Sequence, residues 1–239
     1  MKIAIIGYGK MGKMIEETAV EKGYTTGLII DVDNLEDLTI QNLMGHDVAI
    51  EFTAPDAAYK NILTCFDANI PVVSGTTGWL EKFDQVKERC LKENQALVYA
   101  SNFSIGVNIM FALNHHLARI MNNYPGYNPR LEEIHHTRKL DAPSGTAITL
   151  ATILLEEIPR FEKWKLTDQP DGKTIPVKAV RADNIPGIHE VIYESDFDTL
   201  SIRHSAKSRK GFAIGALLAA EFIKEKKGLF SMNDILGLT

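Results

Sequence analysis

Lys2-Ile3-Ala4-Ile5-Ile6-Gly7-Tyr8-Gly9-Lys10-Met11-Gly12 is the stretch that decides the fold. Its first five residues are a short apolar run rich in β-branched side chains, which predicts a strand. The rest fits G-x-G-x-x-G and leads into a helix predicted over residues 10–22. In such a turn the first glycine permits the bend, the second lets backbone approach a pyrophosphate, and the third allows close helix–strand packing. We expect a dinucleotide site at the turn, formed by Gly7, Tyr8, Gly9, Lys10, Met11 and Gly12.

Strand and helix patterns alternate through the first hundred residues. Alternation at this length predicts a parallel sheet covered by helices on both faces. Further strands are predicted at 26–31, 47–52, 71–74 and 96–100, and helices at 55–68 and 80–93. The fold class is therefore α/β, with a Rossmann-type parallel sheet in the first domain.

The pattern changes near residue 104. Consecutive strand-like runs joined by short turns predict an antiparallel or mixed sheet in the second half. We expect helices at 107–121, 145–158 and 211–226, and strands at 130–135, 177–181, 189–195 and 199–204. The expected domains are a dinucleotide-binding domain, 1–103, joined by the C-terminal helix 211–239, and a second α+β domain with a mixed sheet, 104–210.

Composition excludes some classes of protein. The formal net charge is −5, whereas nucleic-acid binding usually needs a basic excess. No apolar run approaches the ~20 residues of a membrane span. Cys65 and Cys90 lack metal-ligand spacing and are expected to be reduced thiols. Met1 leads directly into a strand, with no room for a signal peptide, so we expect a cytoplasmic protein.

Asp31 ends the second predicted strand, close to the ~20-residue distance after the glycines at which an acidic residue contacts ribose. Its carboxylate can accept hydrogen bonds from ribose hydroxyls and would repel a 2′-phosphate. The residues Val32-Asp33-Asn34 offer no arginine to hold that phosphate. We therefore expect NADH as the preferred cofactor, with NADPH possible. The alternative is a solvated carboxylate at a strand end.

Two loops, at residues 74–78 and 100–104, follow the strands predicted at 71–74 and 96–100. They lie at the edge where open α/β sheets bind ligands. Their hydroxyl, amide and backbone groups suit the ribose and carboxamide of a nicotinamide. Phe103 offers a ring that could pack on the nicotinamide. Ordinary turn chemistry is the alternative for both loops. The candidate cofactor residues in them are Gly75, Thr76, Thr77, Ala100, Ser101, Asn102 and Phe103.

The run Glu133-Ile134-His135-His136-Thr137-Arg138-Lys139-Leu140-Asp141-Ala142-Pro143-Ser144-Gly145-Thr146-Ala147 carries the candidate chemistry. The two histidines end a strand, so their side chains point to opposite faces. A histidine donates protons near neutral pH, and a lysine adds positive charge. Backbone N–H groups that open a helix can bind a carboxylate. The run predicts an anion cradle beside an acid; a histidine pair in a surface turn is the alternative. No metal is expected, because His46, His189 and His204 lack ligand spacing.

The sequence closely resembles the bacterial 4-hydroxy-tetrahydrodipicolinate (dihydrodipicolinate) reductases of lysine and diaminopimelate biosynthesis. The resemblance runs nearly from end to end, although the chain is short for the family and a full helix is expected to be missing between residues 31 and 47. The motifs that carry it are G-Y-G-K-M-G at 7–12, E-F-T-A-P at 51–55, S-G-T-T-G-W at 74–79, S-N-F-S-I-G-V-N at 101–108, H-H-x-x-K-x-D-A-P-S-G-T-A at 135–147, V-R-A-D-N-I-P-G-I-H-E at 180–190 and H-S-A-K-S-R at 204–209.

The resemblance implies reduction of a small dianionic cyclic imine by a nicotinamide cofactor. It implies that His135 is the acid/base residue and that Lys139 donates a proton and binds substrate. It also implies a homotetramer built by the second domain. The absence of nucleic acid and membrane as partners is expected from the composition instead. The substrate-binding positions so implied are His136, Gly145, Thr146 and Thr77, and Ser144 joins them as part of the predicted anion cradle.

Two other functions share the dinucleotide turn. An amino- or imino-acid dehydrogenase of the same two-domain build would not need the His-His-x-x-Lys run, and substrate specificity separates the two. A redox sensor that binds NADH and a partner protein would not need proton donors beside an anion cradle. Loss of all turnover with NADH binding intact would favour the sensor.

Overall fold

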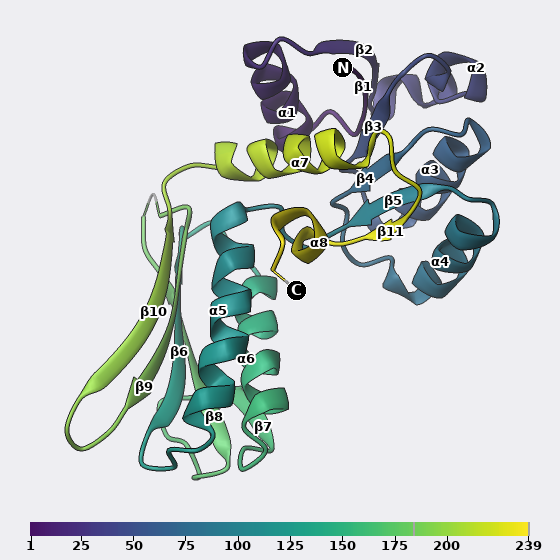
Figure 1. Cartoon of the computed structure of the whole chain (residues 1–239). Helices are drawn as coiled ribbons and strands as arrows, with labels where there is room; N and C mark the ends of the chain where they lie inside the picture. The colour runs from purple at the N-terminus through teal and green to yellow at the C-terminus, as the bar shows by residue number, and fades with distance from the viewer. Residues whose placement is uncertain (184, 239) are drawn as a thin grey trace. The chain divides into compact units, whose positions relative to one another are not determined.

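The computed structural model describes residues 1–183 and 185–238 (Figure 1). These divide into two units: unit 1 is Met1–Ile105 together with the chain from Arg209 onward, and unit 2 is Gly106–Ser208. Asn184, inside the motif at 180–190, and Thr239, at the end of the expected C-terminal segment, lie outside the described residues. Within the described residues, no helix is both long and apolar enough to cross a membrane.

Unit 1 contains one parallel sheet with the strand order β11-β5-β4-β3-β1-β2. The parallel sheet expected from the alternating pattern is therefore confirmed. Strand β11, near the C-terminus, was not predicted, because three residues carry too little periodicity. The strands are β1 (Lys2–Ile6), β2 (Thr25–Ile30), β3 (Val48–Glu51), β4 (Val72–Ser74), β5 (Ala96–Tyr99) and β11 (Gly228–Phe230).

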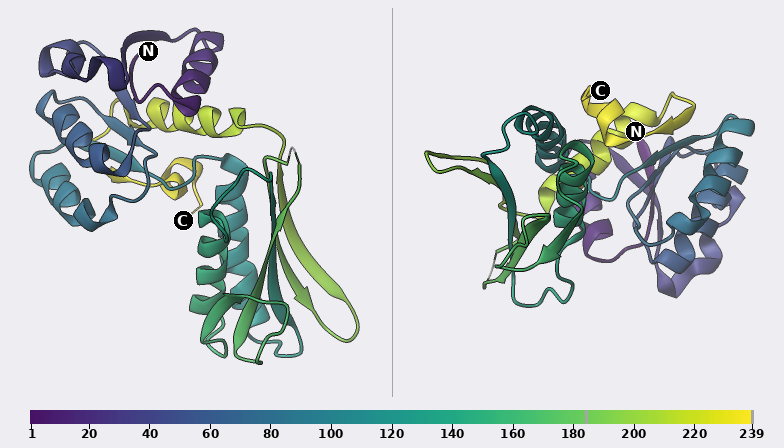
Figure 2. Two further views of the ribbon diagram at one scale, coloured as in Figure 1. Left: turned by 180° about the vertical axis from the view of Figure 1, so that it is seen from behind. Right: turned by 90° about the horizontal axis from the view of Figure 1, so that it is seen from below.

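Helices cover both faces of this sheet (Figures 1 and 2). Helices α1 (Lys10–Glu21) and α7 (Lys210–Ile223) bury apolar side chains against one face, and α7 contacts β3, β4 and β5. On the other face lie α2 (Ile40–Leu43), α3 (Pro55–Asp67) and α4 (Phe83–Lys92). A short helix α8 (Met232–Leu236) follows β11. The expected C-terminal helix 211–239 is therefore wrong as one element, because α7 ends at Ile223.

The segment between β2 and β3 is short, as the sequence indicated. It contains a 3₁₀ helix, Val32–Asp37, and the single turn of α2 instead of a full helix. A second 3₁₀ turn, Leu80–Lys82, precedes α4, so the helix expected at 80–93 is split.

Unit 2 is a mixed sheet with two helices on one face (Figures 1 and 2). The strand order is β10-β9-β6-β8-β7, in which β6 pairs antiparallel with β9 and parallel with β8. The mixed sheet is confirmed. Strand β7 was not predicted, because the alternation in Lys-Trp-Lys-Leu covers only four largely exposed residues. The elements are α5 (Ile105–Met121), β6 (Asn128–His135), α6 (Gly145–Glu157), β7 (Lys163–Leu166), β8 (Thr174–Arg181), β9 (Gly187–Glu194) and β10 (Thr199–Ala206).

Strand β6 shows which way the sheet faces. Leu131, Glu133 and His135 are buried, whereas Glu132 and Ile134 between them are partly exposed. Leu131 belongs to a core shared with α6, so the buried set points to the helices. Alternation along β6 therefore places a carboxylate and an imidazole under the start of α6, and leaves the opposite face without a helix of unit 2.

Candidate active site

The glycine turn has the geometry that a dinucleotide needs. Gly7 has φ +94°, and its N–H donates to the carbonyl of Ile30 at 2.8 Å, which closes the bend after β1. Gly9 is the N-terminal cap of α1. A Cβ at Gly12 would lie 2.2 Å from the Gly7 carbonyl oxygen, so helix and turn touch there. The N-terminus of α1 thus presents backbone N–H groups beside glycines that have no side chain, the arrangement that binds a pyrophosphate.

A cavity of about 350 Å³ opens beside this turn. Asp31 is its only charged lining residue, and Val32 and Leu35 form an apolar wall beside it. The Asn34 side chain fixes the position of Asp31, since its Oδ1 accepts the Asp31 N–H at 2.7 Å and its Nδ2 donates to the Ile29 carbonyl at 3.0 Å. The residues that line this cavity include neither lysine nor arginine.

A second cavity, of about 390 Å³, adjoins the first and shares Gly9, Phe52 and Thr53 with it. Gly75, Thr76 and Thr77 line it, as does the start of α1 at Lys10 and Met11. The two cavities follow the carboxyl ends of β1 to β4, where ligands bind in open parallel sheets. The residues present therefore fit a nicotinamide dinucleotide.

A buried carboxylate organises the loops around this second cavity. Glu51, at the end of β3, is fully buried and accepts hydrogen bonds from Ser74 Oγ at 2.6 Å and Thr76 Oγ1 at 2.8 Å. It also accepts the Thr53 N–H at 3.1 Å, and Thr76 Oγ1 accepts the same N–H at 2.7 Å. Glu51 thereby joins the loops after β3 and β4. Sequence reasoning gave Glu51 no role beyond the E-F-T-A-P motif.

Ala100 to Phe103 follow β5 and lie outside the lining of both cavities. Phe103 is 2% exposed, and its ring packs on Phe52 with centroids 5.6 Å apart. Its side chain is therefore part of the core, which leaves the backbone as the part of Phe103 that a cofactor can reach. Asn102 Oδ1 accepts the Ser104 N–H at 2.8 Å, so this amide shapes the turn into α5.

In unit 2, the segment 135–146, called here the histidine–lysine segment, connects β6 to α6. His135 is 7% exposed at the end of β6, and the more exposed His136 begins the loop. Ser144 caps α6: its Oγ accepts the Ala147 N–H at 3.2 Å and lies 3.0 Å from His189 Nε2. The Ser144 hydroxyl is thus engaged inside the protein, so Gly145 and Thr146 in the first turn of α6 are the better placed for a ligand.

Lys139 is held by its neighbour in the loop. Its Nζ lies 2.7 and 2.6 Å from the two carboxylate oxygens of Asp141, and that hydrogen-bonded pair lowers the pKa of Asp141. The Lys139 side chain is 21% exposed, so the ammonium is reachable from solvent. An arriving substrate carboxylate can exchange for Asp141 as the partner of this cation.

The environment of the histidines favours their neutral forms. Burial lowers the pKa of His135, and the positive charges of Lys139 and Arg181 lower it further, against the opposing effect of Glu133. Burial also lowers the pKa of His189, to about 3. Negative charge placed beside His135 would favour its protonated form.

Three residues missed by the sequence analysis meet at this site: Glu133, Arg181 and His189. Glu133 Oε2 lies 3.6 Å from His135 Nδ1 and 3.8 Å from His189 Nε2. These three donor atoms are within 4.8 Å of one another, a spacing that a metal ion could use, but the carboxylate already accepts N–H groups from Ser144 and Arg181. Alternation along β6 could have flagged Glu133, since it places a charge on the buried face.

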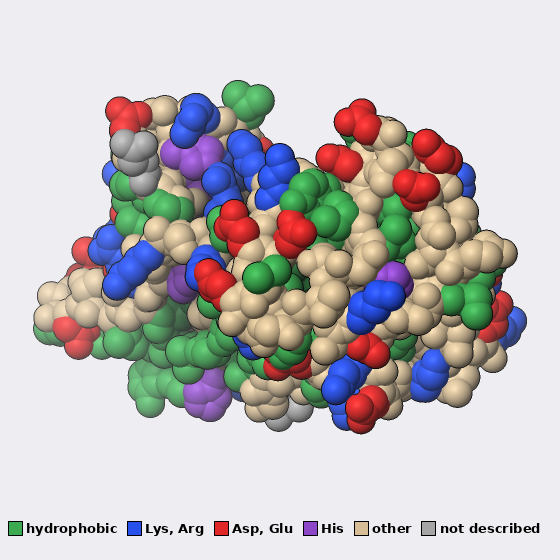
Figure 3. Space-filling view, turned by 90° about the horizontal axis from the view of Figure 1, so that it is seen from above, with side chains coloured by type: hydrophobic (Ala, Val, Ile, Leu, Met, Phe, Trp, Pro, Cys, Tyr) green, Lys and Arg blue, Asp and Glu red, His purple; other side chains and the backbone are tan. Residues whose placement is uncertain are grey.

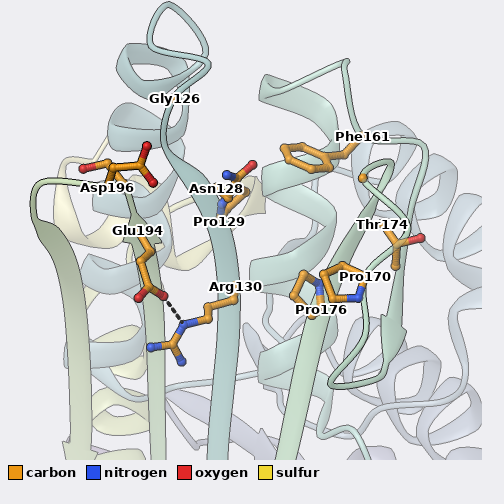
Figure 4. Close-up of a pocket in the computed structure, with 12 residues that line it drawn as sticks. Gly126, Asn128, Pro129, Arg130, Phe161, Pro170, Thr174, Pro176, Glu194 and Asp196 are labelled. Atoms are coloured by element: carbon orange, nitrogen blue, oxygen red, sulfur yellow. Dashed lines mark hydrogen bonds and ion pairs between the residues drawn. The ribbon is translucent and has the colours of Figure 1, made fainter.

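Another cavity of unit 2, of about 440 Å³, lies at the opposite end of β6 (Figure 4). Arg130 points into it but is neutralised by ion pairs with Glu132 and Glu194. Asp196 adds negative charge to the lining, and Phe161 adds apolar surface. Arg130 therefore has two carboxylate partners, whereas Lys139 of the histidine–lysine segment has one, Asp141.

A parallel sheet with a glycine turn is joined here to an α+β unit that carries a buried histidine, a lysine and a helix N-terminus. This combination is typical of a nicotinamide-dependent dehydrogenase or reductase. Comparisons with known proteins narrow this class. Residues 1–103 match the family model of the dihydrodipicolinate reductase N-terminus, and residues 106–236 match that of its C-terminus. The chain belongs to the dihydrodipicolinate reductase family, and the resemblance seen in its motifs is confirmed.

Individual relatives agree with this assignment. The chain is 50% identical to the 4-hydroxy-tetrahydrodipicolinate reductase of Christiangramia forsetii, over 99% of this chain and 98% of the relative. It is 32% identical to the enzyme of that name from Neisseria gonorrhoeae, over 100% of this chain and 98% of the relative. A dipicolinate-bound dihydrodipicolinate reductase from Paenisporosarcina sp. TG-14 has the same fold, with a TM-score of 0.77, 23% identity and 97% of each chain covered.

Proposed function

We propose that this protein reduces 4-hydroxy-tetrahydrodipicolinate to tetrahydrodipicolinate with a nicotinamide cofactor. The observation that carries the proposal is the histidine–lysine segment, in which a buried imidazole, a cation and the N-terminus of α6 follow one another within residues 135–146. Membership of the reductase family supports it. Basic side chains also gather around histidine on part of the face seen in Figure 3, as binding of a dianion requires.

Each residue of the segment has a proposed task. The first-turn N–H groups of α6, at Gly145 and Thr146, bind one substrate carboxylate with the help of the helix dipole. Lys139 leaves Asp141 and neutralises that carboxylate. Loss of the 4-hydroxyl group as water gives a conjugated imine, and His135 or Lys139 gives the proton that completes its reduction. The nicotinamide, when bound in unit 1, supplies the hydride, and Thr77 borders its cavity.

A coupled assay tests the activity. Fresh substrate is generated from pyruvate and aspartate semialdehyde by the preceding synthase, and loss of reduced-cofactor absorbance is followed. Oxidation that depends on the synthase is the expected result. If protein that binds NADH oxidises neither NADH nor NADPH in this assay, the substrate assignment is wrong and another imine becomes the better candidate.

Replacing Lys139 with alanine should raise KM for the imine substrate and lower kcat. The variant loses the only ammonium of the segment and, with it, a charge-assisted contact to a carboxylate. We expect kcat/KM to fall about 100-fold, the size of effect found when a buried hydrogen bond to a charged group is lost. Steady-state kinetics with varied substrate measures this. A change in NADH affinity alone would contradict the proposed carboxylate site.

We propose that NADH is preferred over NADPH, because Asp31 faces the adenosine cavity and the residue after it is Val32. The Asp31→Ser variant removes the repulsion of a 2′-phosphate while keeping a hydrogen-bonding group for ribose. The ratio of kcat/KM for NADPH to that for NADH should rise about tenfold, which corresponds to one screened charge–charge contact. An unchanged ratio would show that Asp31 does not select the cofactor.

We also propose a cytoplasmic homotetramer. Cys65 and Cys90 are both buried free thiols, which fits a reducing compartment. The face of the unit 2 sheet away from its helices carries the partly exposed Ile134 and Ile188 among charged side chains, a surface that another copy of the chain could cover. Analytical ultracentrifugation of the purified protein should give a species of four chains.

A further inference from the structure

Glu133 is a charged residue in a place where charges are rare. It lies in the middle of the buried face of β6, and its exposed fraction is 0%. A carboxylate out of water is tolerated only when it is paired and hydrogen-bonded. The partners of Glu133 therefore indicate why this position carries a charge.

One carboxylate oxygen holds the start of α6. Glu133 Oε2 accepts the Ser144 N–H at 3.0 Å. His189 approaches the same turn from β9, where its Nε2 lies 3.0 Å from Ser144 Oγ. The helix N-terminus is thereby fastened to β6 and β9 through one residue.

The other oxygen holds the loop before α6. Glu133 Oε1 accepts Arg181 Nη1 at 3.3 Å and Nη2 at 3.4 Å. The same guanidinium donates onward, from Nη2 to the Asp141 carbonyl at 2.6 Å and from Nε to the Lys139 carbonyl at 3.3 Å. The backbone that carries Lys139 is thus fixed to β8 and, through Arg181, to β6.

The imidazole of His135 is the third neighbour. Its Nδ1 is 3.6 Å from Glu133 Oε2, and its ring meets that of His189 edge-on with centroids 5.0 Å apart. The carboxylate favours the protonated form of His135, against burial and two nearby cations. The charged or titratable groups that face His135 are Glu133 on β6, Lys139 and Asp141 in the loop, Arg181 on β8 and His189 on β9.

We propose that Glu133 is a positioning residue of the reductase. Its carboxylate holds the Lys139 loop through Arg181 and the N-terminus of α6 through the Ser144 N–H. Its charge acts directly on His135. Glu133 touches no substrate in this scheme. The inference rests on the proposed function, since that function places the substrate at residues 135–146. It adds that the substrate site is built around one buried carboxylate.

The Glu133→Gln variant tests this with little change in shape. A glutamine amide has one oxygen and one NH₂ group, so either Ser144 N–H or Arg181 must face a donor. We expect KM for the imine to rise about tenfold and kcat/KM to fall about 10–100-fold, the range expected when hydrogen bonds to a charged group are lost. KM for NADH should stay within about twofold, because both cofactor cavities belong to unit 1.

The dependence of kcat/KM on pH distinguishes a positioning role of Glu133 from a role in stability alone. If His135 is the donor, kcat/KM falls as pH rises through the pKa of His135 in the free enzyme. Without the Glu133 charge that pKa is lower, so the falling limb should move to lower pH in Glu133→Gln. In Glu133→Asp, which keeps the charge but is shorter, the limb should stay near the wild-type position while KM for the imine remains raised.

Two further variants complete the experiment. Glu156→Gln, at an exposed position of α6, makes the same charge change away from the site and should behave as wild type. If Glu133→Gln does not fold, Arg181→Lys replaces it, since a lysine cannot hold a carboxylate and two carbonyls as the guanidinium fork does. Arg181→Lys should then raise KM for the imine by a similar factor.

The outcomes are distinct from those that test the proposed function. A Glu133→Gln enzyme with a lower melting temperature, but with wild-type KM and an unmoved pH limb, has lost only stability and overturns the inference. Wild-type protein that fails to reduce the imine overturns the proposed function instead. If His135→Gln keeps full turnover, His135 is not the donor, and KM for the imine, which reports on the Lys139 loop and α6, still decides the role of Glu133.

Discussion

The His135→Gln variant should lose turnover by about 10²–10⁴-fold, the contribution of a positioned general acid. Glutamine has a similar size and can hydrogen-bond, but it carries no transferable proton near neutral pH. Its side chain would remain in the pocket formed by Glu133, His189 and the start of β9, where Gly187 leaves room beside the imidazole. The change therefore removes the proton with the smallest change in packing.

Steady-state kinetics and a pH profile measure this effect. The wild-type kcat/KM should fall as pH rises, with a midpoint below the usual histidine range, because burial lowers the pKa of His135. That limb should be absent in the variant. NADH affinity, measured by fluorescence titration, should not change. His116→Gln, at an exposed position of α5, is the control and should keep full turnover. If His135→Gln keeps full turnover, Lys139 or solvent donates the proton that completes the reduction.

Gly7→Ala should destabilise unit 1 more than any other single methyl addition in the glycine turn. Gly7 has φ +94°, which L side chains rarely adopt, and its Cβ would lie 2.1 Å from the Phe52 carbonyl oxygen. The Phe52 backbone cannot move aside as a flexible side chain can. The steric overlap therefore adds to the strain of a positive φ at an alanine. We expect a loss of about 3 kcal/mol or more in the free energy of unfolding, together with loss of NADH binding. Urea denaturation and NADH titration measure the two effects.

Gly9→Ala is the matched control from the same turn. Gly9 has an ordinary negative φ of −74°, and a Cβ there would meet no atom within 4 Å. Stability should change by no more than about 0.5 kcal/mol, as at open surface positions. NADH should nevertheless bind about tenfold more weakly, because the methyl group would occupy the path along which backbone approaches the pyrophosphate. Equal loss of stability in the two variants would contradict the assigned roles of the glycines.

Most elements of the fold follow from local patterns. β1 occupies Lys2–Ile6 as expected, and α3 begins at Pro55, a residue suited to the first turn of a helix. The strands and α-helices that were missed, β7, β11, α2 and α8, are three to five residues long. Such short segments gain their structure from neighbouring strands and helices, so their own residues carry little periodic signal.

The candidate site also has a part that the local sequence predicted correctly and a part that it did not. The glycine turn and Asp31 follow two consecutive strands of the chain, β1 and β2, and the structure lines one cavity with Gly7, Gly9 and Asp31. The expectation that Phe103 packs on the nicotinamide ring used its residue type alone; its side chain belongs to the core instead. Ser144 was expected to offer its hydroxyl to substrate, and that hydroxyl caps α6 and meets His189.

The sequence by itself determined the α/β class, the dinucleotide turn and the order of His135, Lys139 and the start of α6, because each depends on residues close together in the chain. Only the tertiary structure decided which charges are buried and what they hold. Glu133, Arg181 and His189 lie on three strands, β6, β8 and β9, and they meet because the mixed sheet places those strands side by side. Pairing of distant strands depends on the register of the whole sheet, so the partners of a buried carboxylate cannot be deduced from local spacing.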